Sequence, residues 1–179
     1  MKLLLSGGAK NGKSMYAQHA AKRLAGNGPL YYIATMEPCD EEDLARILRH
    51  RREREGWGFE TLEWGREIGL KKKGANKDGT FLLDSVTALL ANELFRADGT
   101  VDAAAPGRVA MELVTLADSV RHIIFVSDTI FSDAANYGAY TQQYRRGLAF
   151  ADRKLAACCD AVAELCAGQS AVYKGELLL

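Results

Sequence analysis

The stretch SGGAKNGKS at residues 6–14 limits the possible folds more than any other part of the sequence. From Gly7 to Ser14 it fits the pattern G-x-x-x-x-G-K-[S/T], with an apolar run before it and an amphipathic helical pattern after it. When a glycine-rich loop connects a strand to a helix, the N–H groups of the loop and the N-terminus of the helix can face a bound anion. The stretch therefore predicts a phosphate-binding loop, and its alternative is a glycine-rich turn with an exposed lysine.

Short apolar runs alternate with longer helical patterns along the rest of the chain, which favours a parallel α/β sheet. We expect strands at 2–6, 30–34, 80–84 and 122–127, and weaker ones near 161–166 and 171–174. We expect helices at 13–25, 41–55, 86–96, 106–119 and 140–158. The connections at 65–79, which include the run Lys71–Lys73, and at 98–106 are too short to separate domains. Residues 1–179 are therefore expected to form one domain.

The residues of the loop have separate expected roles. Its glycines let the backbone curl around phosphate oxygens, Lys13 can reach the β and γ phosphates, and Ser14 can ligate Mg²⁺. Asp84 in TFLLDS follows an apolar run, so it is the candidate that holds the same metal directly or through water. Asp84 or Ser85 can also cap the following helix, and the two roles are compatible. The loop residues expected to bind a nucleotide are Gly7, Gly8, Ala9, Lys10, Asn11, Gly12, Lys13 and Ser14.

Charge and cysteine content exclude several classes of function. Lys plus Arg and Asp plus Glu number 23 each, so no overall field draws the chain to nucleic acid or to an anionic membrane. The sequence NKDG at 76–79 is one residue short of the guanine-reading motif of switch GTPases, which favours a small-molecule kinase or nucleotidyltransferase. Four cysteines without a C-x-x-C pair indicate free thiols in a reducing cytoplasm. No apolar run reaches 18 residues, so no membrane span is expected.

The stretch DEEDLARILRHRREREGWG predicts a helix with acidic residues in its first turn and basic residues toward its end. Leu44, Ile47, Leu48 and Arg51 are expected to form an inward stripe, with His50 at its edge. Imidazole is a nucleophile when neutral, and the arginines around His50 can neutralise nucleotide phosphates. The alternative is a solvated helix face that carries an incidental histidine.

Four segments occur in a recognisable order: LLLSGGAKNGKS, YYIAT, DEEDLARILRHRRER and LLDSVTALLANELF. In these segments the chain resembles the bifunctional adenosylcobinamide kinase / adenosylcobinamide-phosphate guanylyltransferase family of cobalamin biosynthesis. The resemblance implies a three-layer, RecA-like P-loop NTPase fold with a mainly parallel central sheet, assembled as a homotrimer. It also implies that ATP or GTP, with Mg²⁺, phosphorylates a corrinoid, adenosylcobinamide. GMP from GTP is then transferred to that phosphate through a guanylylated histidine.

The resemblance also implies roles for single residues. His50 falls on the position of the histidine nucleophile, and Lys13 serves the phosphoryl transfer. The further nucleotide contacts it implies are Ile33, Ala34, Thr35, Arg51, Arg52, Glu53, Arg54, Glu63 and Asp84. The chain departs from the family pattern at Ser127–Asp128, where Asn-Glu is usual, and at Asp152–Arg153, where Asn-Gln is typical. Two alternatives remain: a kinase or nucleotidyltransferase of this lineage with another acceptor, and a non-catalytic nucleotide-binding paralogue.

Overall fold

Seven strands form one sheet in this computed structural model, which describes residues 1–69 and 74–177. The strand order is β3-β2-β4-β5-β1-β6-β7. All neighbouring pairs are parallel except the last, in which β7 runs antiparallel to β6. The strands are β1 (Lys2–Gly7), β2 (Leu30–Ala34), β3 (Glu60–Glu63), β4 (Thr80–Asp84), β5 (His122–Val126), β6 (Ala161–Cys166) and β7 (Gln169–Lys174). The expected mainly parallel sheet is confirmed.

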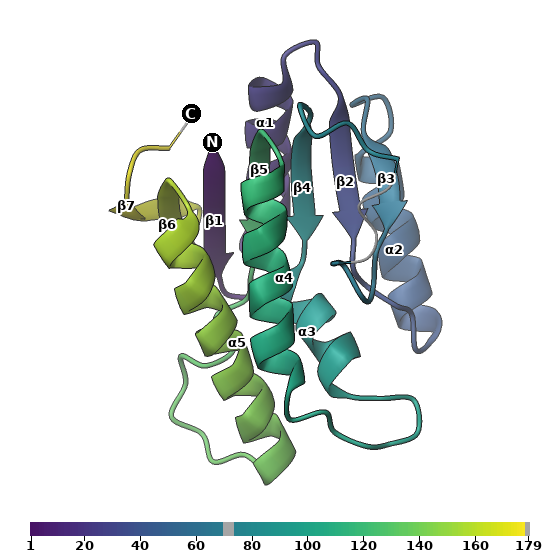
Figure 1. Cartoon of the computed structure of the whole chain (residues 1–179), viewed down its shortest axis with the longest axis vertical. Helices are drawn as coiled ribbons and strands as arrows, with labels where there is room; N and C mark the ends of the chain where they lie inside the picture. Colours follow the sequence, from purple (N-terminus) through teal and green to yellow (C-terminus); the bar gives the residue numbers. More distant parts are fainter. Residues whose placement is uncertain (70–73, 178–179) are drawn as a thin grey trace.

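Helices cover both faces of the sheet and make three layers (Figure 1). On one face α1 packs against the central strands, and on the other face α3, α4 and α5 pack against one another and against the sheet. The helices are α1 (Lys13–Ala25), α2 (Glu41–Glu53), α3 (Val86–Leu94), α4 (Ala105–Ser119) and α5 (Ala139–Cys158). No helix in the described part of the chain is both long and apolar enough to cross a membrane.

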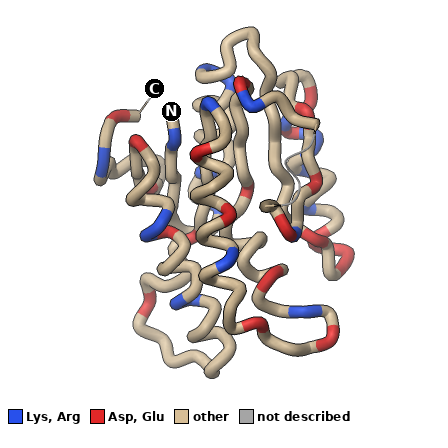
Figure 2. Tube along the Cα trace, in the orientation of Figure 1, with Lys and Arg blue, Asp and Glu red and all other residues tan. Residues whose placement is uncertain are grey.

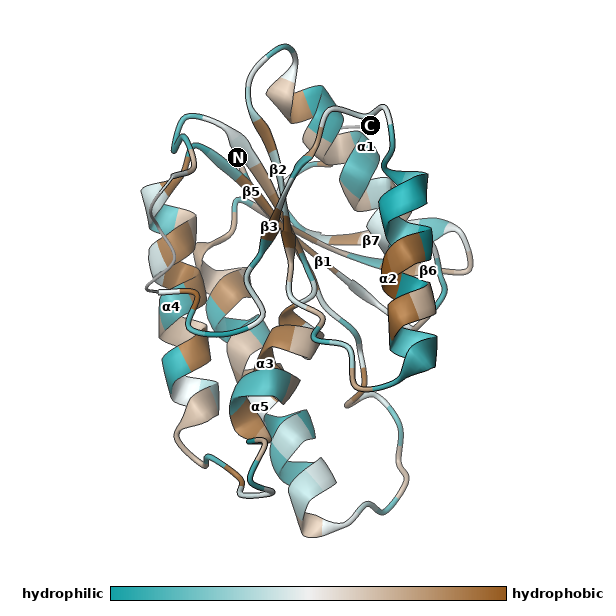
Figure 3. Ribbon diagram, turned by 90° about the vertical axis from the view of Figure 1, so that its right-hand side faces the viewer, coloured by the Kyte–Doolittle hydropathy of each residue, from teal (hydrophilic) through white to brown (hydrophobic). Residues whose placement is uncertain are grey.

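The central strands are apolar on both faces because each face carries its own core. In β1, Leu3 and Leu5 point into the core under α1, whereas Leu4 points into the core under α3, α4 and α5. All three leucines are at most 3% exposed. Figure 3 shows these hydrophobic strands in the middle of the molecule. Continuous apolar runs are typical of parallel strands that are covered on both sides.

Strand β3 is the element that the sequence patterns do not predict. Its sequence ETLE lacks an apolar run, and it lies at the edge of the sheet, where three of its four residues are exposed. The other elements match their expected positions, with ends that differ by at most two residues. The run Lys71–Lys73 lies outside the described residues.

Helix α2 corrects one expectation about the arginine-rich stretch. It begins at an Asp40 cap, whose carboxylate accepts a hydrogen bond from the Asp43 N–H, and it buries none of its residues. Leu44 and Leu48 are 50% and 53% exposed and Arg51 is exposed too, so the prediction that these three residues face inward is wrong. The half-buried positions are Asp43, Ile47 and His50. Because α2 lies beside the edge strand β3 (Figure 1) instead of over the core of the sheet, its less exposed face combines Ile47 with polar residues, the histidine among them.

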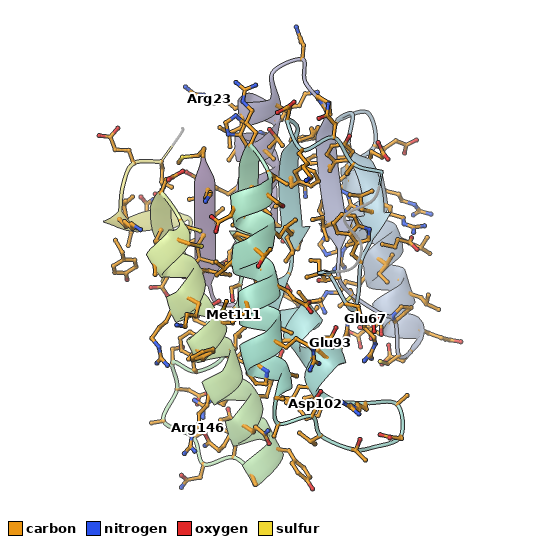
Figure 4. The ribbon with its side chains drawn as sticks, viewed as in Figure 1. Arg23, Glu67, Glu93, Asp102, Met111 and Arg146 are labelled. Carbon is orange, nitrogen blue, oxygen red and sulfur yellow. The ribbon has the colours of Figure 1, made fainter. Side chains whose placement is uncertain are left out.

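The connection between α3 and α4 is held by an ion-pair network. Arg108 of α4 pairs with Glu93 at 2.9 Å and with Asp102 at 3.1 Å, and Asp102 also pairs with Arg96 at 2.8 Å. Glu93 accepts a further hydrogen bond from the N–H of Glu67. Figure 4 labels Glu67, Glu93 and Asp102, which lie toward the end of the molecule where the parallel strands finish. The network fixes two connections that leave this end of the sheet.

Candidate active site

The carboxyl ends of β1, β2, β4 and β5 meet at one edge of the sheet. This edge carries the loop after β1, the start of α3 after β4 and the segment after β5 (Figure 1). Ligands of open α/β sheets bind in the crevice outside these carboxyl ends. The geometry at this edge therefore decides what the chain can bind.

The glycine-rich loop has the backbone that its sequence predicts. Gly7 and Gly12 have φ angles of 146° and 90°, and α1 starts at Lys13 with no side-chain cap. A Cβ atom on Gly7 would lie 2.3 Å from the Leu165 carbonyl oxygen, so only glycine fits there. Gly8, Ala9 and Lys10 are exposed. The loop therefore leaves amides and an uncapped helix N-terminus open to solvent, which is the arrangement that holds anions.

Lys13 is folded back over this loop. Its side chain is 6% exposed, and its Nζ donates to the Gly8 carbonyl oxygen at 2.6 Å. The same Nζ lies 2.9 Å from Oδ1 of Asp128, which follows β5. The lysine ammonium thus lies inside the loop, paired with a carboxylate.

Asp84 ends β4 at the same edge, two strands from β1. Its Oδ2 accepts a hydrogen bond from the Tyr32 hydroxyl at 2.9 Å, and burial raises the pKa of Tyr32 well above its usual range. Ser85 caps α3 by accepting a hydrogen bond from the Ala88 N–H at 3.2 Å. Since Ser85 supplies the cap, the Asp84 carboxylate is left for the crevice. Asp84 and Ser14 are both half-buried and offer oxygen atoms, which is the donor type that Mg²⁺ prefers.

Arg54, at the end of α2, connects that helix to Asp84. Its guanidinium carbon lies 3.5 Å from the centroid of the Tyr32 ring, a cation–π contact. Arg54 is 6% exposed, burial lowers its pKa, and its Nη1 has no hydrogen-bond partner among the described residues. A cavity of about 580 Å³ adjoins it, lined by Arg51, Arg52, Arg54, Glu55, Gly56, Gly58, Phe59 and Thr61. Three guanidiniums around one cavity favour an anionic ligand.

His50 lies one turn before Arg54 on the inner face of α2. Residues four apart on a helix are neighbours, so the imidazole faces the same side as the Arg54 stack. The side chain is 30% exposed, and Nδ1 lies 3.2 Å from Oε2 of Glu53. Figure 2 shows the acidic start and the basic later part of this helix. No hydrogen bond or ion pair joins His50 to residues 7–14 within 1–69 and 74–177.

The remaining residues that the sequence predicts for the site differ in their burial and in their partners. Ile33 is buried in the core under α3, α4 and α5, and Thr35 is buried in a reciprocal hydrogen-bond pair with the backbone of Ser85. Ala34 is partly exposed at the end of β2. Glu63, at the end of β3, forms an ion pair with Arg51. The side chains of Arg52 and Glu53 lie on the exposed part of α2.

Both tryptophans of the chain, Trp57 and Trp64, are held by packing against other side chains. Trp57 packs edge-on against His19 of α1, with ring centroids 4.8 Å apart. Trp64 is 9% exposed in the core under α3, α4 and α5. Neither ring lies free at the crevice.

Two residues of this edge are not among the expected site residues. Tyr32 is hidden within an apolar strand, and nothing in the sequence connects it to Arg54 or Asp84. Asp128 does have a signal, because HIIFVSD places a carboxylate just after an apolar run, as TFLLDS does for Asp84. Its ion pair with Lys13 depends on β5 lying next to β1, which the sequence does not predict.

The sheet order, the phosphate-binding loop and the strand-end Asp84 define a P-loop NTPase-type protein with a RecA-like fold. The flagellar accessory protein FlaH from Methanocaldococcus jannaschii has a similar structure, with a TM-score of 0.53 at 10% identity over 97% of this chain and 78% of that one. A structural-project protein from Pyrococcus horikoshii OT3 gives a TM-score of 0.51 at 7% identity, over 97% and 86% of the two chains. At such identities the similarity concerns the fold alone.

Sequence comparison assigns the family. Residues 3–172 match the model of the cobinamide kinase / cobinamide phosphate guanyltransferase family, and the chain belongs to that family. It is 36% identical to the bifunctional adenosylcobalamin biosynthesis protein CobU of Escherichia coli K12 over 104 residues. These residues make up 57% of this chain and 55% of that protein. It is 34% identical to the CobU of Salmonella typhimurium LT2 over 114 residues, and these residues make up 63% of this chain and 60% of that protein. The match therefore spans less than two thirds of either relative.

Proposed function

We propose that this chain phosphorylates adenosylcobinamide with ATP or GTP and then transfers GMP from GTP to the resulting phosphate through a guanylylated His50. The observation that carries the proposal is the pairing of two features around Asp84. The loop with Lys13 lies on one side of it, and the helix with His50 and Arg54 is joined to it through Tyr32. Family membership and the two CobU relatives support the same pair of reactions.

The residues of the phosphate-binding loop carry out the phosphoryl transfer. Loop amides and the N-terminus of α1 hold the phosphates, and Lys13 leaves the Gly8 carbonyl oxygen to bind the β and γ phosphates. Ser14 and Asp84 hold Mg²⁺ directly or through water. When it is bound, the ion supplies positive charge that offsets the charge developing on the phosphate oxygens. The chain contributes mainly positioning and charge neutralisation to this step.

The residues at the C-terminal end of α2 carry out the guanylyl transfer. A nitrogen of His50 attacks the α-phosphorus of GTP, the bond to the β-phosphate breaks, and pyrophosphate leaves with the electron pair. Arg51, Arg52 and Arg54 stabilise the charge on the α-phosphate and on the leaving group. Cobinamide phosphate then displaces the histidine and takes the GMP. Ile33, Ala34, Thr35, Glu53 and Glu63 complete the nucleotide site that we assign to this edge of the sheet.

We also propose that residues 1–179 act as one domain that assembles as a homotrimer in the cytoplasm. One sheet with a core on each face supports the single domain, and four free cysteines fit a reducing compartment. The trimer follows from the family pattern in the sequence. Light scattering coupled to size-exclusion chromatography tests it, and a mass of one chain would contradict it.

A product assay tests the proposed pair of reactions. Purified protein is incubated with adenosylcobinamide, Mg²⁺ and GTP, and the corrinoid products are separated and weighed by mass spectrometry. The proposal predicts adenosylcobinamide phosphate first and the GDP-linked corrinoid after it. If the protein transfers the phosphoryl or nucleotidyl group to another acceptor and not to the corrinoid, the enzyme acts on that other acceptor. Nucleotide binding without transfer to any acceptor would indicate a non-catalytic protein.

A further inference from the structure

Asp128 is the carboxylate that forms an ion pair with the phosphate-binding loop in the described part of the chain. The residues on either side of it continue the pairing of β5 with β1, because the Ser127 N–H donates to the Leu5 carbonyl oxygen and the Thr129 N–H donates to the Gly7 carbonyl oxygen. The N–H of Asp128 itself donates to Oγ1 of Thr87 in the first turn of α3. Three backbone hydrogen bonds therefore fix this residue between the loop and the helix that follows Asp84.

The side chain of Asp128 is partly open. Oδ1 pairs with Lys13 Nζ at 2.9 Å, the side chain is 30% exposed, and Oδ2 has no hydrogen-bond partner within 1–69 and 74–177. When a nucleotide binds, Lys13 turns to its phosphates, so the terminal phosphate lies next to the carboxylate that Lys13 was paired with. A hydroxyl that attacks this phosphate comes within reach of Asp128.

The other candidate bases near this edge are engaged elsewhere. Asp84 accepts the Tyr32 hydroxyl and lies two strands away from β1. Asp152 of α5 is 8% exposed, and its Oδ2 accepts the Ser127 hydroxyl at 3.0 Å. His50 lies on α2, beside β2 and β3. Of the carboxylates that the described part of the chain brings to this edge, Asp128 is thus the open one that contacts Lys13.

We propose that Asp128 is the general base of the phosphoryl transfer, which rests on the function proposed above. Its carboxylate takes the proton of the acceptor hydroxyl while the hydroxyl oxygen forms a bond to the γ-phosphorus. The bond between the γ-phosphorus and the β-phosphate oxygen breaks, and the nucleoside diphosphate leaves with the electron pair. Next to Asp128 in the chain, the Ser127 hydroxyl donates to Oδ2 of Asp152 and ties this segment to α5.

The variant Asp128→Asn tests the inference because it keeps the size of the side chain and removes its basicity. We expect kcat for cobinamide phosphorylation to fall by about 100-fold or more, which is the usual loss for a general base. The Kd for GTP should stay unchanged or decrease, since Lys13 loses its competing partner. Guanylylation of the enzyme, and GMP transfer to cobinamide phosphate supplied ready-made, should stay within about threefold of the unmodified protein.

Two further variants sharpen the test. Asp128→Glu retains a carboxylate and should recover much of the lost kcat, whereas Asp78→Asn, in the exposed turn before β4, should leave all activities unchanged.

Three results would contradict either the role of Asp128 or the proposed function, and they can be told apart. Full kinase activity in Asp128→Asn would overturn the role of Asp128 alone. Equal loss of the kinase and guanylyl reactions would show that Asp128 only supports the loop, and would also overturn it. An unmodified protein without kinase activity would instead overturn the proposed function, and this inference with it.

Discussion

The guanidinium carbon of Arg54 lies over the ring of Tyr32, 3.5 Å from its centroid, and the Tyr32 hydroxyl donates to Asp84. This contact links the arginine-rich helix α2 to the end of β4. Because α2 buries none of its own residues, contacts near its C-terminal end hold it in place. The position of His50, one turn earlier, therefore depends on this stack.

Replacing Arg54 with lysine should separate stacking from charge. Lysine keeps the positive charge and loses the planar guanidinium that covers the ring. A cation–π contact of about 1 kcal/mol corresponds to roughly a fivefold change in rate, so guanylylation should slow by about fivefold to tenfold. The kinase rate should stay within about threefold. Arg23→Lys, at an exposed position labelled in Figure 4, is the matched control, and equal guanylylation by both variants would argue against the role of the stack.

Lys13→Ala should weaken nucleotide binding. The buried ammonium is the one positive side chain that contacts the loop among the described residues, so its loss removes a charge-assisted contact with the phosphates. Such a contact is worth roughly 2 kcal/mol, so the Kd for GTP measured by calorimetry should rise by about 30-fold. Lys77→Ala, at the opposite end of β4, should bind as the unmodified chain does. Unchanged affinity in Lys13→Ala would exclude the assigned role.

The sequence predicts the phosphate loop and most of the sheet because these features depend on local order. The apolar runs, the glycines and the helical periods identify the loop and its flanking elements without any tertiary contact. Strand β3 is not predicted from the sequence because ETLE forms an exposed edge strand and carries no apolar run. The inner face of α2 is mispredicted because periodicity places Leu44 and Leu48 in a core that the helix does not reach.

The site itself is only partly accessible from sequence. Asp84 and Lys13 belong to recognisable local patterns, and His50 is identified by a family resemblance. The pairing of Lys13 with Asp128 and the stack of Arg54 on Tyr32 join residues more than 20 positions apart. Both depend on the order of the strands, which a single sequence does not reveal.

Gly7→Ala should unfold more easily than the unmodified chain. Its φ of 146° is a conformation that residues with a Cβ rarely adopt, and the new Cβ would lie 2.3 Å from the Leu165 carbonyl oxygen. We expect a loss of more than about 2 kcal/mol in the free energy of unfolding, measured by urea titration. Gly107→Ala in the first turn of α4 has no atom near its Cβ and should be neutral or gain up to about 1 kcal/mol. Equal stability of the two variants would contradict the close approach at Gly7.

Asp152 should make stability depend on pH. Burial raises the pKa of its carboxyl to about 7 in the folded chain, against roughly 3.9 when unfolded. Between these values the folded chain holds the proton more tightly, so this residue makes the chain less stable as pH rises from about 4 to about 7. Asp152→Asn removes the effect. Its advantage in the free energy of unfolding should therefore grow by on the order of 2 kcal/mol between pH 5 and pH 8.

Urea titrations at several pH values measure this difference. Asp78→Asn, at an exposed position, is the control and should show the same pH dependence as the unmodified chain. A constant difference between Asp152→Asn and the unmodified chain from pH 5 to pH 8 would show that Asp152 does not titrate in this window.

Covalent labelling with α-³²P GTP tests the central claim, that His50 carries the guanylyl group. The unmodified protein should acquire a label that is stable in alkali and lost in acid, as expected of a phosphorus–nitrogen bond to histidine. His19→Ala, which alters an exposed histidine on α1, should label equally, and the label should leave when cobinamide phosphate is added. His50→Ala should bind GTP and acquire no label. Equal labelling of His50→Ala and the unmodified protein would contradict the account.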